Sequence, residues 1–280
     1  MGVKTAFLNG DLDEEIYMQQ LDGFVVNGQE RKVCKLVKSL YGLKQVPKQW
    51  HEKFNTTLTS GGFVVNEAGK CVYYRYGGGK GVILCLYVDD ILIFGTHLKV
   101  IEEVKAFLSH NFEMKDLGMA DVILNIKLLR DTEGGIKLFQ SHYVEKILSR
   151  FGYSDCKPSA TPYEPSARIR KFEGTTVDQL RYSQVVGSLM YLACATRPDI
   201  SFFVCKLSRF VSNPRDVHWH VVERVMRYLQ GTVNYGIHYS GYPTVLEGYS
   251  GSNWISDADE MKATSGYVFT LGGGAVSWKS

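Results

Sequence analysis

Several features that would assign a chain to a class at once are missing here. No apolar run is long enough to span a bilayer, and Met1 is followed by Gly-Val-Lys and not by a charged-then-apolar leader. The six cysteines form no C-x-x-C pair and follow no regular spacing, so we expect reduced thiols. Together these absences predict an intracellular protein of the cytoplasm or nucleus, neither secreted nor membrane-embedded.

A large excess of charge is also missing. The net charge of +3 permits a polyanionic partner without requiring one. Hydrophobic residues make up 45% of the chain and charged residues 22%, close to the averages for globular proteins, which argues against a disordered or fibrous chain. Its 280 residues suffice for one large domain or two to three smaller ones, each with its own core.

One pair of apolar, β-favouring runs stands out in the first half. Residues 82–87 and 91–94 are separated only by Val88-Asp89-Asp90, which predicts a hairpin with carboxylates at its tip. Two adjacent carboxylates repel each other unless a cation neutralises them, and a divalent metal is the natural partner. For the pair alone, a solvated acidic turn is the more common explanation.

The remaining patterns alternate strands and helices, which predicts an α+β fold. Apolar periodicity and turn residues predict strands over 3–12, 122–129, 136–139, 245–250, 264–271 and 274–278, and helices over 40–58, 98–112, 179–195, 198–212 and 216–230, with a further helix from Ser141 and a linker over 157–176.

Two other clusters are assigned no chemistry. Residues 77–80, Gly-Gly-Gly-Lys, lack the strand-loop-helix context of a phosphate loop and predict a hairpin turn. His218 and His220 are two positions apart in a predicted helix, so they should point in different directions and not share a metal.

Six segments resemble, in the family's order along the chain, the reverse-transcriptase region of Copia-type LTR-retrotransposon Pol polyproteins. The hairpin tip, Tyr87-Val88-Asp89-Asp90, is similar to the family's Y-x-D-D motif. The others are Val3-Lys4-Thr5-Ala6-Phe7-Leu8-Asn9-Gly10, similar to D-V-K-T-A-F-L-N-G without its first residue; the segment 39–50, similar to S-L-Y-G-L-K-Q-A-P-R-x-W; and the downstream segments 112–118, 195–200 and 265–269.

The resemblance implies an architecture and three domains. A reverse-transcriptase palm, an antiparallel sheet with helices, would occupy 1–140 with its fingers missing. A helical thumb or connection would follow over 141–240, and a truncated ribonuclease H-like β segment over 241–280.

The resemblance also implies RNA-directed DNA synthesis with Mg²⁺ as cofactor and a primer–template of RNA or DNA and dNTP as partners. Asp89 and Asp90 would be the catalytic metal ligands, with Tyr87 and Val88 at the substrate. The family's other essential carboxylate falls on Gly2, which has no side-chain oxygen. Losing such a ligand costs roughly a thousandfold or more in rate, so we expect little or no polymerase activity.

Four further residues are implied to lie at the substrate. Phe7 falls where the family keeps an aromatic that excludes a ribose 2′-hydroxyl, although a core aromatic explains it equally well. Lys44 and Gln45 match the segment near template and incoming nucleotide. Lys48 replaces the common arginine and presents a cation to phosphate without a bidentate fork.

The end of the chain resembles the first ribonuclease H strand, where the family reads Y-S-D. Gly251 stands in the place of the acid, so we expect no hydrolysis of an RNA–DNA hybrid, and Asp257 and Asp259 are interpreted as solvated loop acids.

An alternative function is a non-catalytic nucleic-acid-binding remnant. It rests on the cations of the helical half, which could follow a duplex backbone but equally suit a solvated helical surface. They are Lys146, Arg150, Arg168, Arg170, Lys171, Arg181, Arg197, Lys206, Arg209, Arg224 and Arg227.

Overall fold

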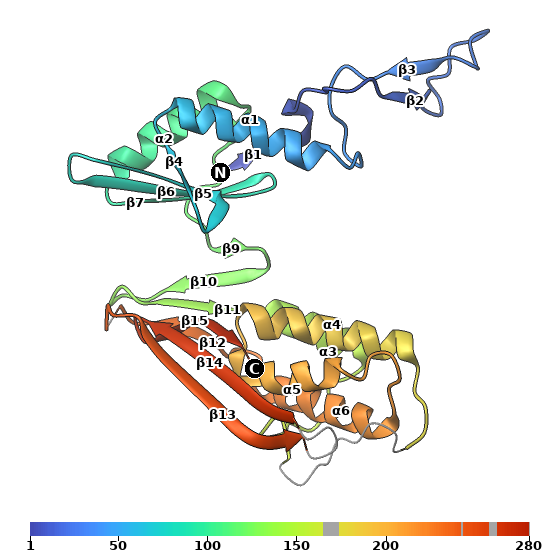
Figure 1. The fold of residues 1–280 in the computed structure, drawn as a ribbon, viewed down its shortest axis with the longest axis vertical. Helices are drawn as coiled ribbons and strands as arrows, with labels where there is room; N and C mark the ends of the chain where they lie inside the picture. Colours follow the sequence, from blue (N-terminus) through green and yellow to red (C-terminus); the bar gives the residue numbers. More distant parts are fainter. Residues whose placement is uncertain (165–173, 242, 258–261, 280) are drawn as a thin grey trace. The chain divides into compact units, whose positions relative to one another are not determined.

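The structure is a computed structural model that describes residues 1–164, 174–241, 243–257 and 262–279. The chain divides into two compact units, residues 1–120 and 121–280 (Figure 1). Each unit has its own cluster of buried apolar side chains, and the two clusters share no residue. The mixed α+β class is confirmed, whereas the three-domain division at residues 140 and 240 stays a prediction.

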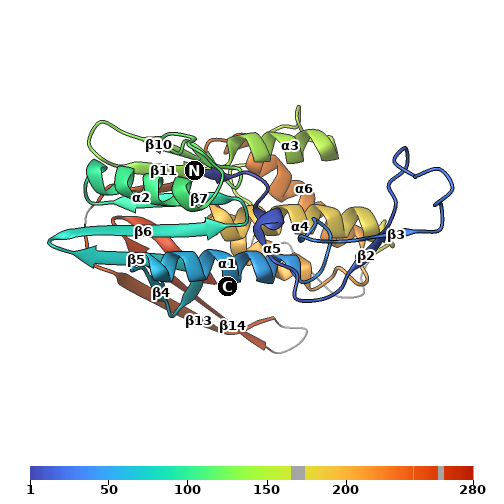
Figure 2. The same cartoon turned by 90° about the horizontal axis from the view of Figure 1, so that it is seen from above.

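The first unit is a six-stranded sheet in the order β4-β5-β6-β7-β1-β8, with helices α1 and α2 on one face (Figures 1 and 2). Alternate residues of β6 are buried against the helices, as the period of two in a strand requires. The bounds are β1 Gly2–Val3, β4 Val64–Asn66, β5 Gly69–Gly77, β6 Lys80–Tyr87, β7 Asp90–Gly95, β8 Met114–Lys115, α1 Val46–Ser60 and α2 Leu98–Asn111.

The predicted hairpin at residues 82–94 is confirmed, as is the turn at Gly78 and Gly79, both of which have positive φ angles. The strand predicted over 3–12 is wrong beyond Val3. Thr5 takes a left-handed conformation, with φ of 49°, and residues Ala6–Asn9 form a 3₁₀ helix. The Asn9 side-chain amide donates to the carbonyls of Thr5 and Ala6 and stabilises this turn.

Helix α1 begins six residues later than predicted. Gly42 has a φ of +100°, which a helix does not admit, and Pro47 lies in the first turn of α1, where its missing N–H has no cost. An arm that the sequence patterns did not predict precedes this helix, formed around strands β2 (Tyr17–Gln19) and β3 (Val33–Lys35).

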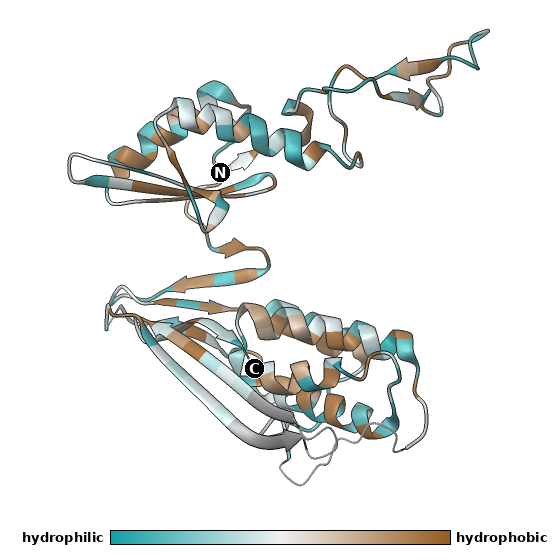
Figure 3. Cartoon of the chain, viewed as in Figure 1, coloured by the Kyte–Doolittle hydropathy of each residue, from teal (hydrophilic) through white to brown (hydrophobic). Residues whose placement is uncertain are grey.

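The described residues of the second unit form two sheets and four helices, and apolar residues run along α4 and α5 (Figure 3). The predicted helices are confirmed to within a few residues. The sheets are ordered β12-β11-β10-β9 and β13-β14-β15. The bounds are β9 Val122–Ile123, β10 Ile126–Arg130, β11 Ile136–Phe139, α3 Ser141–Phe151, α4 Gln179–Ala195, α5 Pro198–Ser208, α6 Asp216–Gly231, β12 Gly236–Tyr239, β13 Glu247–Asp257, β14 Lys262–Leu271 and β15 Gly274–Lys279.

Several details of the second unit differ from the predictions, including β12, which was not predicted, and β13, which continues past the predicted end at residue 250. The strand predicted over 122–129 is broken, because Leu124 and Asn125 have φ angles of 51° and 60° and turn the chain back on itself. Asp257 ends strand β13 and so does not lie in a loop, while Asp259 lies outside the described residues. In the described part of the chain, no helix is both long and apolar enough to cross a membrane.

Candidate active site

The acidic hairpin ends in a two-residue turn. Tyr87 pairs with Asp90, so Val88 and Asp89 form the turn and Asp90 is the first residue of β7. Val88 has a φ of 53°, a conformation in which a β-branched side chain is strained. Such a conformation persists only where the surroundings over-determine it.

Short hydrogen bonds to the backbone hold this hairpin against the rest of the first unit. The buried indole of Trp50 donates from Nε1 to the carbonyl of Val88 at 2.8 Å. On the other side, the amide of Val3 donates to the carbonyl of Asp89 at 2.7 Å, and the amide of Ile91 donates to that of Met1 at 2.8 Å. The N-terminal strand and the hairpin are therefore adjacent in the sheet, although Met1 and Ile91 are 90 residues apart in sequence.

Gly2 is the direct strand partner of Asp90. A Cβ atom at position 2 would lie 3.7 Å from Oδ1 of Asp90 and 3.5 Å from Cδ1 of Leu117, both ordinary van der Waals distances. A side chain at position 2 would therefore fit and would start beside the Asp90 carboxylate. The backbone at position 2 would accept an acidic side chain, and the acid is absent only because the residue is glycine.

The Asp89 carboxylate is only half satisfied. Its Oδ1 is buried and has no hydrogen-bond partner, whereas Oδ2 accepts a long hydrogen bond of 3.4 Å from the Tyr41 hydroxyl. Partial burial and then the charge of Asp89 raise the pKa of the Tyr41 phenol, which keeps it protonated as a donor. A buried oxygen without a partner in a native site calls for an explanation such as a bound ion.

The two carboxylates suit one Mg²⁺ ion, which proteins commonly hold with one or two carboxylates while substrate oxygens and water complete its shell. They do not suit a pair of ions. In the described ranges, no group of three His, Cys, Asp or Glu side chains is placed to hold a metal.

Phe7 lies on the 3₁₀ helix and contacts Tyr41, with ring centroids 4.7 Å apart. It is half-buried and also packs against the core of the unit. The geometry therefore leaves both interpretations of Phe7 open, a wall beside the candidate site and a core aromatic.

Lys44, Gln45 and Lys48 surround the start of α1. Gln45 is the residue immediately before the helix, and both lysines are exposed, with Lys48 Nζ 3.6 Å from Glu52. In the part of the chain that the structure describes, none of the three makes a hydrogen bond or ion pair with Asp89 or Asp90. Their assignment to the substrate stays a prediction.

Sequence reasoning gave no role to Tyr41 and Trp50, the two residues of segment 39–50 that reach the hairpin. The available signal was that both are aromatic residues inside a matched motif. Both residues are far from Asp89 in the sequence, so sequence patterns alone could not predict their contacts with the hairpin.

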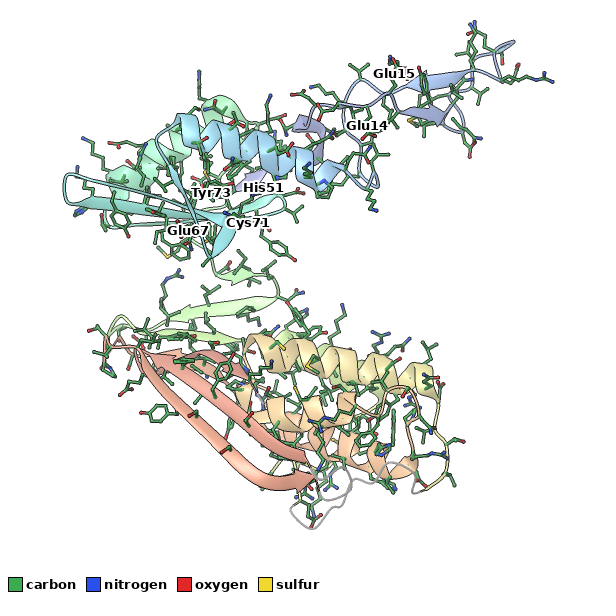
Figure 4. The ribbon with its side chains drawn as sticks, in the orientation of Figure 1. Glu14, Glu15, His51, Glu67, Cys71 and Tyr73 are labelled. Carbon is green, nitrogen blue, oxygen red and sulfur yellow. The ribbon has the colours of Figure 1, made fainter. Side chains whose placement is uncertain are left out.

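The acids of the arm do not fill the place of Gly2. Glu15 pairs with Lys35 and accepts from Tyr17 on the arm itself, and Figure 4 shows Glu14 and Glu15 there. Exposed salt bridges of this kind contribute little to stability. They nevertheless show that the Glu15 carboxylate has its partners on the arm and not beside Gly2.

A second group of titratable side chains lies where α1 passes β4 and β5 (Figure 4). Nε2 of His51 is 3.0 Å from the carbonyl of Lys70 and 3.5 Å from the Tyr73 hydroxyl. Burial raises the pKa of Tyr73 to about 12, so its phenol is neutral. Figure 4 labels Cys71 and Glu67 in the same region, and both are exposed, so we assign this group no chemistry.

In the second unit, Gly251 pairs with Gly266 in the β13–β14 ladder and is exposed. A Cβ atom at position 251 would meet nothing within 4 Å. His218 is buried and its Nδ1 accepts from the Arg215 amide, whereas His220 is exposed beside Glu223, so the two histidines do point in different directions.

The cations of the helical half are only partly available to a ligand. Arg197 is buried and engaged by Asp199 and Thr232, and Arg224 pairs with Glu164. Arg227 donates to the carbonyl of Lys157. Arg168, Arg170 and Lys171 lie outside the described residues.

Comparison with known proteins identifies the family of the chain. The profile of the family described as reverse transcriptase (RNA-dependent DNA polymerase) matches residues 1–165. Over its whole length the chain is 44% identical to the retrovirus-related Pol polyprotein from transposon TNT 1-94 of Nicotiana tabacum and 37% identical to that from transposon RE1 of Arabidopsis thaliana. It is 36% identical to the putative transposon Ty5-1 protein of Saccharomyces cerevisiae and covers 92% of that protein.

The chain spans about a fifth of the two plant polyproteins, 22% and 19% of their lengths. No solved structure matches. The family profile over more than half of the chain, together with the similarity to the yeast protein over nearly all of both chains, shows that the chain belongs to the reverse-transcriptase family of Copia-type retrotransposon Pol polyproteins.

Proposed function

We propose that this chain is the reverse-transcriptase segment of a retrotransposon polyprotein, impaired in nucleotidyl transfer because position 2 lacks a carboxylate. The observation that carries the proposal is the pairing of Gly2 with Asp90, which places the empty position beside the acidic hairpin. The first unit would act as the palm, and the second would supply the thumb or connection and the start of a ribonuclease H-like segment.

In this proposal Asp89 and Asp90 are the catalytic metal ligands. The unpartnered Oδ1 of Asp89 supports such a role, since it is the oxygen that lacks any other partner. Mg²⁺, when bound there, would stabilise negative charge that develops on the transferred phosphate. Tyr87 and Val88, together with Phe7, Lys44, Gln45 and Lys48, would border the primer–template and dNTP.

The missing ligand decides the rate. An ion held by the carboxylates of the hairpin alone is free to shift. Positioning accounts for much of catalysis in phosphoryl transfer, so such a shift lowers the rate. With Asp at position 2, a carboxylate would approach the ion from the neighbouring strand. We expect this loss to cost roughly a thousandfold in rate. For the ribonuclease H-like segment, Gly251 implies no activity.

Primer extension with Mg²⁺ or Mn²⁺ tests the proposal. The unaltered chain should incorporate dNTP at or near the background rate, and Gly2→Asp should raise incorporation by at least tenfold. Gly251→Asp is the matched control, because it adds the same side chain in open space on the other unit. Robust extension by the unaltered chain would remove the proposed impairment.

The alternative, a non-catalytic nucleic-acid-binding remnant, gives a different result. Its signature is binding to primer–template that weakens steeply with salt. The internal engagement of Arg197, Arg224 and Arg227 leaves fewer cations for such binding. We therefore expect a shallow salt dependence, measured by fluorescence anisotropy at low and moderate ionic strength.

A further inference from the structure

The segment from Ser39 to Trp50 touches the acidic hairpin at two separate points. At its end, Trp50 holds the backbone of the turn through the carbonyl of Val88. Near its start, the Tyr41 hydroxyl reaches Oδ2 of Asp89. Trp50 therefore donates to the backbone of the turn, whereas Tyr41 donates to the Asp89 carboxylate itself.

The contact from Trp50 is of the kind that fixes a conformation. At 2.8 Å it is a short hydrogen bond, and the indole is 2% exposed, so water does not replace it. Its acceptor belongs to Val88, the residue with the strained φ of 53°. Without this bond, a buried indole N–H would lose its partner and the turn would be free to relax toward an unstrained conformation.

The same segment is itself fastened to the first unit. Ser39 is fully buried, and its Oγ lies 3.0 Å from the carbonyl of Gly10 and 2.8 Å from Oε1 of Gln49. Trp50 and Phe54 pack into the core with Phe112. The two contacts with the hairpin thus start from a fixed base and not from a mobile loop.

We infer that Trp50 and Tyr41 are positioning residues that clamp the turn and thereby set the direction of the Asp89 carboxylate. The inference rests on the proposed function, in which Asp89 is a metal ligand. Trp50 would keep the backbone of Val88 in its left-handed conformation. Tyr41 would keep Oδ2 of Asp89 turned away, so that the unpartnered Oδ1 remains free for a cation.

Amide hydrogen exchange in the full-length chain tests the backbone half of the clamp without any metal. Trp50→Phe keeps an aromatic ring in the core but removes the N–H donor. The amides of Val3 and Ile91 form the hydrogen bonds that join the hairpin to the N-terminal strand. We expect their exchange rates to rise roughly fivefold, which corresponds to the loss of one buried hydrogen bond of about 1 kcal/mol.

Trp278→Phe is the matched control, because that indole also donates to a backbone carbonyl at 2.8 Å, but in the second unit. It should leave exchange at Val3 and Ile91 unchanged. Unchanged exchange in Trp50→Phe overturns the inference. An equal rise at Leu84 in the middle of β6 also overturns it, since that would be general destabilisation.

Mn²⁺ binding, measured by electron paramagnetic resonance of free Mn²⁺, tests the carboxylate half in chains that carry Gly2→Asp. Trp50→Phe should weaken binding by roughly three- to tenfold, and Tyr41→Phe by roughly twofold, since its hydrogen bond is long. Tyr17→Phe is the control for Tyr41, because Tyr17 is also exposed and also donates to a carboxylate, that of Glu15.

The outcomes separate the inference from the proposed function. Faster exchange in Trp50→Phe with unaltered Mn²⁺ binding makes Trp50 a merely structural residue and overturns the positioning role. If Gly2→Asp alone gains no affinity for Mn²⁺, the proposed function fails, and the exchange data then decide by themselves whether the clamp exists.

Discussion

Gly2 is the residue on which the proposed loss of activity depends, and it leaves the strand pairing intact. Its backbone pairs with Asp90 on one side and Lys115 on the other, as any strand residue would. The position has room for a side chain, so nothing in the packing explains why glycine is there.

Gly2→Asp should therefore change stability in a metal-dependent way. In EDTA the new carboxylate lies close to that of Asp90, and two like charges about 4 Å apart in water repel by roughly 1 kcal/mol. We expect the thermal midpoint to fall by a few degrees in EDTA and to recover with Mn²⁺, because ligand binding to the folded state stabilises it. Gly2→Ala should show neither effect, and an equal response in Gly2→Ala would contradict the account.

The Tyr228 phenol should make the free energy of unfolding depend on pH in the alkaline range. Burial, and then the charge of Asp199, raise the pKa of its phenol to about 12, above the ordinary value of 10. The stability that this neutral phenol contributes is fully present below pH 10 and is lost as the pH rises through about 12. Tyr228→Phe should flatten the decline of the unfolding free energy between pH 10 and 12, measured by denaturant titration, although Tyr73 and Tyr153 retain their own contributions. An unchanged slope would argue against this role.

At the scale of elements, Arg197 joins the start of α5 to the end of α6. Its guanidinium is 1% exposed, donates to both carboxylate oxygens of Asp199, and donates to the carbonyl and hydroxyl of Thr232. Arg197→Ala should cost about 3–5 kcal/mol in the second unit, because it leaves buried partners unpaired. Lys105→Ala, which breaks the partly exposed pair with Asp116, should cost less than about 1 kcal/mol. Chemical denaturation measures both, and equal costs would refute the argument.

The elements that sequence patterns predicted best are those with long, regular periodicity. Helix α4 has the predicted bounds, with Tyr182, Val185 and Leu189 buried as expected. The predictions failed where single residues take left-handed backbone angles, at Thr5 and at Leu124 and Asn125, since hydrophobic periodicity carries no signal for them. The arm was missed because its apolar side chains are exposed and show no buried face.

At the scale of the molecule, the two units contain separate cores. A cavity in one core should therefore leave the other intact. Leu189→Ala, in the second core, should raise amide exchange within α4 and cost about 2–5 kcal/mol there, while exchange at Leu84 of the first core stays unchanged. A parallel loss of protection at Leu84 would show that the units unfold together.

The candidate site was predictable from the sequence only in part. The Asp89–Asp90 hairpin and the missing acid at Gly2 both follow from matched motifs, and the structure makes them strand neighbours. The contacts of Trp50 and Tyr41 depend on how distant segments pack, which motif order does not specify. A single sequence without the fold gives residue types but not the atoms that meet.

The central claim is that a carboxylate at position 2 would complete a divalent-metal site with Asp89 and Asp90. The most direct test compares Mn²⁺ dissociation constants of the unaltered chain, Gly2→Asp and Gly77→Asp under identical salt and pH; at position 77 the new side chain would meet nothing within 4 Å of its Cβ atom. We predict that Gly2→Asp alone binds at least about tenfold more tightly, the scale on which a change in a metal's ligand environment acts. Equal affinity in all three chains, or the same gain in Gly77→Asp, would contradict the claim.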